Sequence, residues 1–239
     1  MLRIVEVGVT GLVGSHILTT LLAQPSISTV HAYTRKDIPA ANPKLTAIHN
    51  KDSTTWSSLF PNNTHIFFSA LGTTLAQAGS LENQRKIDLN LNLELAQAAK
   101  NAGVETYVLI SSGQPNVNSR LAFLRMKGEL VEAVKNLGFK HTIILHPGLI
   151  VGDRRDSRPM EAVVRGIASY LGKFQNGALM HPWAQHAEII AGVAVSAGLQ
   201  AAVGKREPGV WALQQADIVR LGFTEWNEPV ERGEGQISA

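Results

Sequence analysis

The sequence has 239 residues, with 22 Lys and Arg against 19 Asp and Glu, which gives a formal net charge of +3. Hydrophobic residues make up 44% and charged residues 17%, which is typical of a globular chain and excludes a disordered or fibrous one. No run of basic residues is longer than two, so binding of nucleic acid through a basic tract is not expected. Cysteine is absent, which excludes disulfides, thiolate zinc sites and cysteine nucleophiles.

Short apolar segments alternate with helical patterns along the chain. The expected strands are 2–7, 28–34, 44–50, 65–70, 104–111, 140–146 and 210–213, and the expected helices are 12–24, 80–101 and 120–137. This alternation indicates right-handed crossovers and a parallel sheet. We therefore predict an α/β fold with a doubly wound parallel sheet, in a single domain over 1–239. Residues 150–239 are expected to form a small C-terminal elaboration on the substrate side.

The longest weakly polar stretch, 187–204, contains Glu188, Ser196 and Gln200. A membrane-spanning helix needs about 20 predominantly apolar residues, so an amphipathic surface helix is expected there instead. A strand pattern that begins at Leu2 leaves no room for a cleavable leader. Any association with a membrane is therefore expected to be peripheral, and the protein intracellular.

A glycine-rich turn, GVTGLVG, follows the first strand. The first glycine of such a turn permits tight bending, the second lets the backbone approach a pyrophosphate, and the third lets the helix lie close to the sheet. The N-terminus of the following helix offers N–H groups to the phosphates. The turn therefore predicts a dinucleotide site. Its candidate binding residues are Gly8, Thr10, Gly11, Leu12, Val13 and Gly14.

The end of the second strand bears on which nucleotide is bound. NAD-binding proteins usually place an acidic residue there, but this chain has Thr34-Arg35-Lys36, and Asp37 comes later. Arg35 could hold a 2′-phosphate with its planar fork and Lys36 adds charge, so NADP(H) is favoured over NAD(H). The alternative is an ordinary solvated strand end.

Two further strand ends are expected to border the same crevice. Ala70, Leu71 and Gly72 follow the fourth strand, where Gly72 would allow close approach of a cofactor, and a simple turn is the alternative. Ser111-Ser112-Gly113 ends the fifth strand, and Lys127 lies on the next helix. A short-chain dehydrogenase would place a Tyr four residues before this Lys, on the same helix face, but here the position holds Phe123.

The chain resembles an atypical, extended-like short-chain dehydrogenase/reductase, and most closely the fungal mitochondrial-proteome family and its animal relative, the Tat-interacting oxidoreductase-like protein. The segments that carry the resemblance are GVTGLVGSHIL, FFSALGTT, KIDLNLNLELAQAAKNAGV, YVLISSG, RMKGEL, PGLIVGDRRDSRP, WAQHAEII and QADIVRLG. The resemblance implies a Rossmann fold and NADP(H) binding at Gly8, Gly11 and Gly14. It also implies peripheral association with the mitochondrial outer membrane, with the cytoplasm as the alternative.

Carried over residue by residue, Ser112 (or Ser111) matches the Ser that orients the carbonyl. Lys127 matches the Lys that holds the ribose and lowers the Tyr pKa. Phe123 cannot donate a proton, and a positioned acid typically contributes about 10²- to 10⁴-fold. His146 stands where the family usually has Arg before Pro-Gly. It could act as an acid or base, or form a structural hydrogen bond.

Other polar residues give weaker signals. Asp88, Asn90 and Asn92, at spacing two, are expected to be mostly solvent contacts. The charged segment 153–159 either lies by the substrate or forms a surface loop. His181 and His186 are too few for a metal site, so no metal is expected. Pro147, after the sixth strand, completes the predicted cofactor-binding set.

Three functions remain open. The first is an NADP(H)-dependent oxidoreductase that acts on a small carbonyl or alcohol. The second is a non-redox isomerase, cyclase, epoxide-opening or dehydrating enzyme that uses His146 or Ser112. The third is a non-catalytic nucleotide-sensing protein. A small-molecule partner is expected, while the substrate and the oligomeric state are left open.

Overall fold

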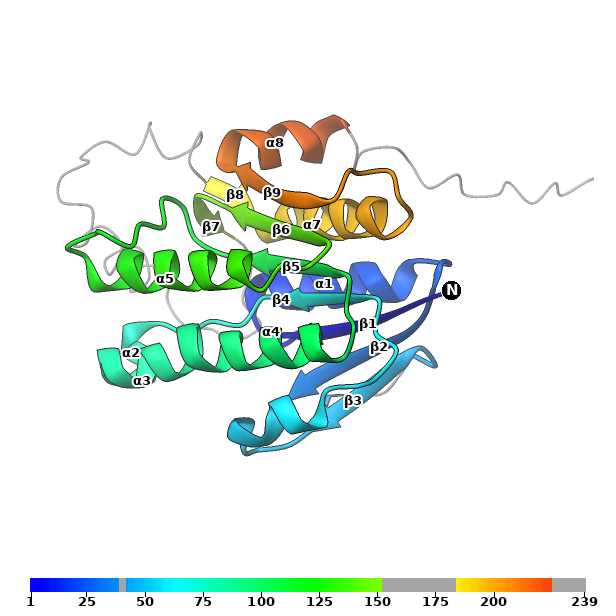
Figure 1. Ribbon diagram of the computed structural model, residues 1–239, viewed down its shortest axis with the longest axis horizontal. Helices are drawn as coiled ribbons and strands as arrows, with labels where there is room; N and C mark the ends of the chain where they lie inside the picture. Colours follow the sequence, from blue (N-terminus) through cyan, green and yellow to red (C-terminus); the bar gives the residue numbers. More distant parts are fainter. Residues whose placement is uncertain (39–41, 152–183, 225–239) are drawn as a thin grey trace, which may run out of the picture.

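A computed structural model describes residues 1–38, 42–151 and 184–224. Seven strands form one parallel sheet in the order β3-β2-β1-β4-β5-β6-β9 (Figure 1). The strands are β1 (Leu2–Val7), β2 (Ile27–Thr34), β3 (Leu45–His49), β4 (Ile66–Ser69), β5 (Thr106–Ile110), β6 (His141–His146) and β9 (Gly209–Gln214). The chain moves outward from β1 to β3 and then returns to β4 on the other side of β1. The predicted doubly wound α/β fold is confirmed.

Helices cover both faces of the sheet (Figure 1). One face carries α1 (Leu12–Ala23), α7 (Ala187–Ala202) and α8 (Gln215–Thr224). The other carries the π turn η2 (Lys86–Leu91), α4 (Asn92–Asn101) and α5 (Ala122–Asn136). The remaining short elements are η1 (Ser53–Leu59), α2 (Leu75–Ala78), α3 (Leu81–Arg85), and the pair β7 (Leu149–Val151) and β8 (Ala184–His186). Both faces of the sheet are therefore buried, as all-parallel sheets require.

Helix α7 corrects one expectation. The segment was predicted to be an amphipathic surface helix, yet ten of its sixteen residues are buried. It packs on the sheet between α1 and α8, so side chains on most of its circumference meet other elements. Small residues permit the close approach: a Cβ at Gly198 would lie 2.9 Å from the Phe68 ring. Burial on several sides, and not a membrane, explains the apolar composition.

The helix predicted over 80–101 forms as α3, η2 and α4 in succession. The π turn was not predicted, and it lies beside the carboxyl end of β4, where the candidate site residues lie. Among the described residues, no helix is long and apolar enough to cross a membrane.

Glu6 on β1 is a buried carboxyl. Its side chain is fully buried on the α1/α7 side of the sheet, and neither carboxyl oxygen has a hydrogen-bond partner in the described structure. Burial raises the pKa of this carboxyl well above its ordinary value. The protonated form is therefore favoured in the folded state, and ionisation opposes folding.

We expect Glu6→Gln to stabilise the protein increasingly as the pH rises. The folded-state pKa of Glu6 is raised, so the free energy of unfolding of wild type falls as the pH rises from the ordinary carboxyl pKa to this raised pKa. The variant has no carboxyl at this position and does not show this fall. Urea denaturation should show little difference at about pH 5 and a gain of roughly 1–3 kcal/mol at about pH 8. The exposed Glu94→Gln is the control. A constant difference between Glu6→Gln and wild type at all pH values would contradict this account.

Candidate functional site

The carboxyl ends of β1, β2, β4, β5 and β6 point to one edge of the sheet (Figure 1). Every predicted site residue that follows a strand lies at this edge. In an open α/β sheet the ligand crevice forms outside these ends, on both sides of the point where the strand order reverses. Here that point lies between β1 and β4.

The glycine turn after β1 is sterically restricted. Gly8 has a φ of +90°, and a Cβ on it would overlap the carbonyl group of Ala70 at the end of β4. A Cβ on Gly14 would overlap the carbonyl oxygen of Gly8. The turn is closed by a hydrogen bond from Gly11 N to Gly8 O at 2.8 Å. These contacts bring α1 and the end of β4 directly against the turn.

The N-terminus of α1 is suited to an anion. Gly11 caps it without a side-chain hydrogen bond, and its first turn contains no acidic residue. The bond from Ser15 N to Gly11 O at 2.9 Å starts the helical series, so the preceding N–H groups remain for a ligand. Thr10 and Gly11 are exposed, whereas the Val13 side chain is buried in the core and could offer only its backbone. This cradle fits a dinucleotide pyrophosphate.

Arg35 and Lys36 lie exposed immediately after β2. Within the described ranges neither forms an ion pair with an acidic side chain. Both cations are therefore available to a phosphate at the end of β2, next to the strand that carries the glycine turn.

Lys127 forms a buried ion pair with Asp88. The distance from Lys127 Nζ to Asp88 Oδ2 is 3.3 Å, and the two side chains are only 8% and 1% exposed. Asp88 Oδ1 also accepts the backbone N–H of Thr73 at 2.6 Å. Burial raises the pKa of Asp88, and the nearby Lys127 opposes this rise. The pair thus joins α5, the π turn η2 and the loop after β4.

Gly72 connects this ion pair to the edge of the sheet. It is exposed, and a Cβ on it would lie 3.6 Å from Asp88 Oδ1 and 3.7 Å from Lys127 Nζ. The ring of Phe123, one helical turn before Lys127, has its centroid 5.8 Å from Nζ. An apolar ring therefore occupies the position at which a phenol would stand, and the cation lies near it.

The expectation that Asp88, Asn90 and Asn92 are mostly solvent contacts is wrong for two of them. Asn90 is exposed, but Asp88 and Asn92 are fully buried. Asn92 accepts from Ser69 Oγ at 2.6 Å and donates to Leu71 O at 3.2 Å, so it holds the end of β4. The signal that could have found them is the spacing of four, which puts both on one helix face.

Gln84 extends the same series by one more step of four residues. It is buried, and its Nε2 donates to the Thr73 carbonyl oxygen at 3.2 Å. Together with Asp88 and Asn92 it fixes the backbone from Leu71 to Thr73 through side-chain hydrogen bonds. The strand end that borders the crevice is thereby held in one conformation.

Two serine hydroxyls after β5 have no hydrogen-bond partner among the described residues. Ser111 Oγ and Ser112 Oγ are both shielded from solvent, and neither makes a hydrogen bond in the described structure. An unused buried donor is costly, and a ligand oxygen is one explanation for it. These hydroxyls fit a role in binding a substrate carbonyl or alcohol.

His146 ends β6 beside these serines. Its Nδ1 lies 3.0 Å from the Ser112 carbonyl oxygen, which can only accept, so Nδ1 is the donor. Burial lowers the pKa of His146, although the bond to Ser112 opposes this. The imidazole is therefore neutral near pH 7, with a basic Nε2. Pro147 is buried, and its carbonyl oxygen would lie 3.2 Å from a Cβ on Gly113.

Some predicted features lie outside the described residues, namely the charged segment 153–159 and His181. His186 is described and exposed at the start of α7. In the described ranges no group of three or more His, Asp or Glu side chains could hold a metal ion.

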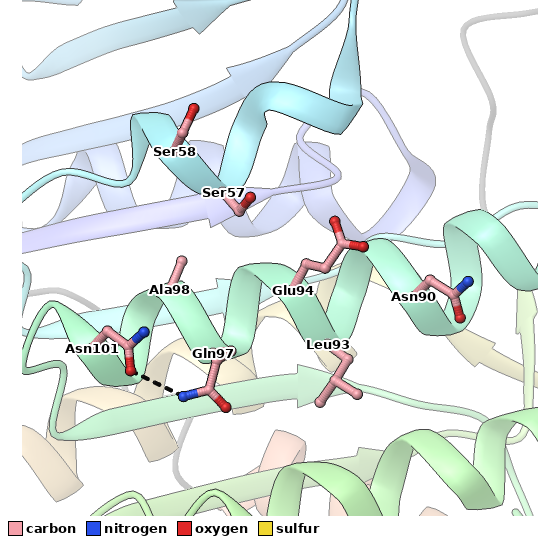
Figure 2. Close-up of a pocket in the computed structure, with 8 residues that line it drawn as sticks. All are labelled: Ser57, Ser58, Asn90, Leu93, Glu94, Gln97, Ala98 and Asn101. Carbon is pink, nitrogen blue, oxygen red and sulfur yellow. Dashed lines mark hydrogen bonds between the residues drawn. The ribbon is translucent and has the colours of Figure 1, made fainter.

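A surface groove of about 690 Å³ lies between η1 and α4, away from the crevice (Figure 2). Among its eight described lining residues, Glu94 is the only ionisable one. The side-chain amide of Gln97 donates to Asn101 Oδ1 on the same helix, so this donor is already used within α4. The groove therefore lacks the chemistry that the edge of the sheet offers.

Comparisons with known proteins agree with this geometry. A family model described as NAD dependent epimerase/dehydratase family matches residues 4–117. Protein fmp52-1, mitochondrial, of Aspergillus terreus is 47% identical over 231 residues, covering 93% of this chain and 99% of that protein. Protein fmp-52, mitochondrial, of Neurospora crassa is 40% identical over 233 residues, covering 93% and 96%.

Solved structures share the fold at low identity. A short chain dehydrogenase family protein from Francisella tularensis has a TM-score of 0.66 and 14% identity, covering 92% of this chain and 99% of that one. MoeE5, solved with UDP-glucose and NAD, has a TM-score of 0.64 and 16% identity, covering 92% and 80%. The sheet and its glycine turn thus define the Rossmann fold that short-chain dehydrogenases share. Within that class, the chain belongs to the family of fungal proteins named fmp52.

We expect Lys127→Met to destabilise the protein because it leaves the Asp88 carboxylate buried without its counter-charge. The free energy of unfolding should fall by about 3–5 kcal/mol near pH 8. It should fall by less as the pH is lowered, because burial raises the pKa of Asp88, the variant lacks the Lys127 charge that opposes this rise, and a protonated carboxyl needs no counter-charge.

Urea denaturation of Lys127→Met, Asp88→Asn and the double variant measures the coupling between the two groups. The double variant should recover part of the stability that Lys127→Met loses. Additive losses in the double variant, or an unchanged Lys127→Met protein, would contradict a stabilising pair.

Proposed function

We propose that the protein is an NADP(H)-dependent oxidoreductase that acts on a small carbonyl or alcohol. The observation that carries the proposal is the position of Gly72. The glycine turn of β1 lies against the β4 end just before it, and the Asp88–Lys127 pair lies directly beside it. The candidate dinucleotide cradle and a buried ion pair thus meet at one strand end, where a nicotinamide and a substrate could lie together. Two structures of similar fold support this class: MoeE5 was solved with NAD, and the Francisella protein is described as a short chain dehydrogenase family protein.

The preference for NADP(H) rests on the two exposed cations after β2. A 2′-phosphate bound by Arg35 would form charge-assisted, bidentate hydrogen bonds, and Lys36 would add a second positive charge. The ribose 2′-OH of NAD(H) offers them no negative charge. Lys127 would also hold the nicotinamide ribose, because its Nζ lies beside the exposed Gly72.

The bound nicotinamide would supply or accept the hydride. Ser112 Oγ, which has no hydrogen-bond partner within 1–38, 42–151 and 184–224, would donate to the substrate oxygen and orient the carbonyl. Lys127 Nζ, which is paired with Asp88 and lies beside the exposed Gly72, would pass a proton to the developing alkoxide directly or through water. Phe123 takes no part in proton transfer, because its ring, 5.8 Å from Nζ, carries no donor.

A second candidate is a non-redox isomerase, cyclase, epoxide-opening or dehydrating enzyme on the same scaffold. His146 favours it, since the ring is neutral near pH 7 and fixed by the Ser112 carbonyl oxygen. A base of this kind could remove a proton from a substrate held by the Ser112 hydroxyl. The same geometry also fits an imidazole whose sole role is the structural hydrogen bond to the Ser112 carbonyl oxygen.

We also propose a peripheral location on the mitochondrial outer membrane, with a small molecule and no nucleic acid as partner. The names of the fmp52 relatives contain the word mitochondrial. In the described ranges no helix could span a bilayer, so attachment through those residues would be at the surface.

We expect Phe123→Tyr to raise NADPH-dependent reduction of carbonyl compounds by about 10²- to 10⁴-fold over wild type. The phenol would restore a proton donor one helical turn from Lys127. Phe123→Leu is the control, because it changes the ring but adds no donor. The measurement is NADPH oxidation across a panel of small aldehydes and ketones.

Absence of NADPH-dependent reduction in both wild type and Phe123→Tyr, with NADPH still bound, would contradict the oxidoreductase proposal. His146→Ala in a nucleotide-free assay then separates the remaining candidates. Loss of a nucleotide-independent reaction favours acid/base catalysis by His146. No reaction in any variant favours the nucleotide-sensing protein.

A further inference from the structure

The two cations and the carboxylate that follow β2 differ in whether they are paired. Arg35 and Lys36 have no acidic partner in the described ranges, whereas Asp37, the next residue, is paired. His49 Nδ1 lies 2.9 Å from Asp37 Oδ1, and His49 Nε2 lies 3.2 Å from the backbone carbonyl oxygen of Arg35. One imidazole therefore bridges the carboxylate and the backbone of the cation-bearing turn.

The backbone places Asp37 on the far side of β2 from the glycine turn. Thr34 Oγ1 donates to Lys36 O at 2.5 Å and accepts from Lys36 N at 3.1 Å, which bends the chain immediately after the strand. His49 ends the edge strand β3 and stands opposite Thr34 in the register of β2 and β3. Since β1 lies on the other side of β2, pairing with His49 draws Asp37 away from the dinucleotide cradle.

The chemistry of the bridge favours a fixed carboxylate. Both partners of the ring accept hydrogen bonds and neither donates, so a ring N–H directed at Asp37 fixes the carboxylate beside the end of β3. Asp37 itself is 92% exposed, so the bridge orients the carboxylate and is not needed to hold the fold together.

We propose that His49 is a specificity-determining residue for the nucleotide. It holds Asp37 at the end of β3, so that a 2′-phosphate meets Arg35 and Lys36 without an opposing carboxylate. Without His49, Asp37 is free to repel the 2′-phosphate and to accept from the ribose 2′-OH of NAD(H), the contact that an acidic residue makes in NAD-binding proteins. This inference rests on the proposed NADP(H) preference and names a residue that maintains it.

The test is a double-mutant cycle at one fixed pH. Isothermal titration gives the Kd values of NADPH and NADH for wild type, His49→Phe, Asp37→Asn and the double variant. His49→Gln is a second variant that keeps a polar side chain of similar size and removes the imidazole that spans Asp37 and the Arg35 carbonyl oxygen. Adenosine 2′,5′-bisphosphate and 5′-AMP, as added probes, report the 2′-phosphate without the nicotinamide.

The matched control is Glu105→Gln. Glu105 forms an exposed ion pair with Lys140 at the same distance of 2.9 Å, but it lies before β5 at the opposite edge of the sheet. This substitution changes the net charge as Asp37→Asn does. It should leave the ratio of the two Kd values unchanged.

We expect His49→Phe and His49→Gln to lower the preference for NADPH over NADH by about 3- to 5-fold. In the Asp37→Asn background the His49 substitution should have no effect on the ratio. An unchanged ratio in both single His49 variants, or an equal loss with and without Asp37, would overturn the role of His49 and leave the dinucleotide site intact. A wild-type protein that binds neither nucleotide would overturn the proposed function itself.

Discussion

The contact between the first glycine turn and the end of β4 is the constraint on which the site depends. Only a residue without a side chain fits at Gly8, because a Cβ would overlap the carbonyl of Ala70. Gly14 lets α1 approach the same turn. As a result, the N-terminus of α1 lies near the end of β4. Gly72, two residues after Ala70, lies beside the buried pair of Asp88 and Lys127. The phosphate cradle and the polar edge are thus parts of one rigid arrangement.

The buried pair of Lys127 and Asp88 gives this arrangement its chemical character. A lysine in a dehydrogenase site ordinarily acts next to a phenol, but here Phe123 provides only an apolar ring. Asp88 supplies the counter-charge that allows the lysine to stay buried, and its second oxygen fixes the backbone at Thr73. The structure therefore holds a buried cation one helical turn from an apolar ring, at the position where a dehydrogenase has its phenol. The proposed reductase would take its proton from Lys127 or water, and the alternative non-redox enzyme would use His146 or Ser112.

The parallel sheet, the glycine turn and the placement of site residues at strand ends could be predicted from the sequence. Each is set by local pattern, such as apolar runs that alternate with helices. The burial of Asp88 and Asn92 depends on contacts with Ser69, Leu71 and Thr73 at the end of β4, which their polar side chains alone do not predict. The bridge from His49 to Asp37 depends on the register of an edge strand, which local sequence does not fix. The burial of α7 likewise depends on neighbours from distant parts of the chain.

Isothermal titration with NADPH and NADH, on wild type and Arg35→Ala, tests the central claim most directly. The account predicts that wild type binds NADPH more tightly than NADH. Arg35→Ala should weaken NADPH binding by about 10- to 100-fold and leave NADH binding unchanged, because only the 2′-phosphate contact is lost. Absence of heat with NADPH and NADP⁺ at millimolar concentration, from a folded wild-type protein, would show that the glycine turn binds no phosphorylated dinucleotide.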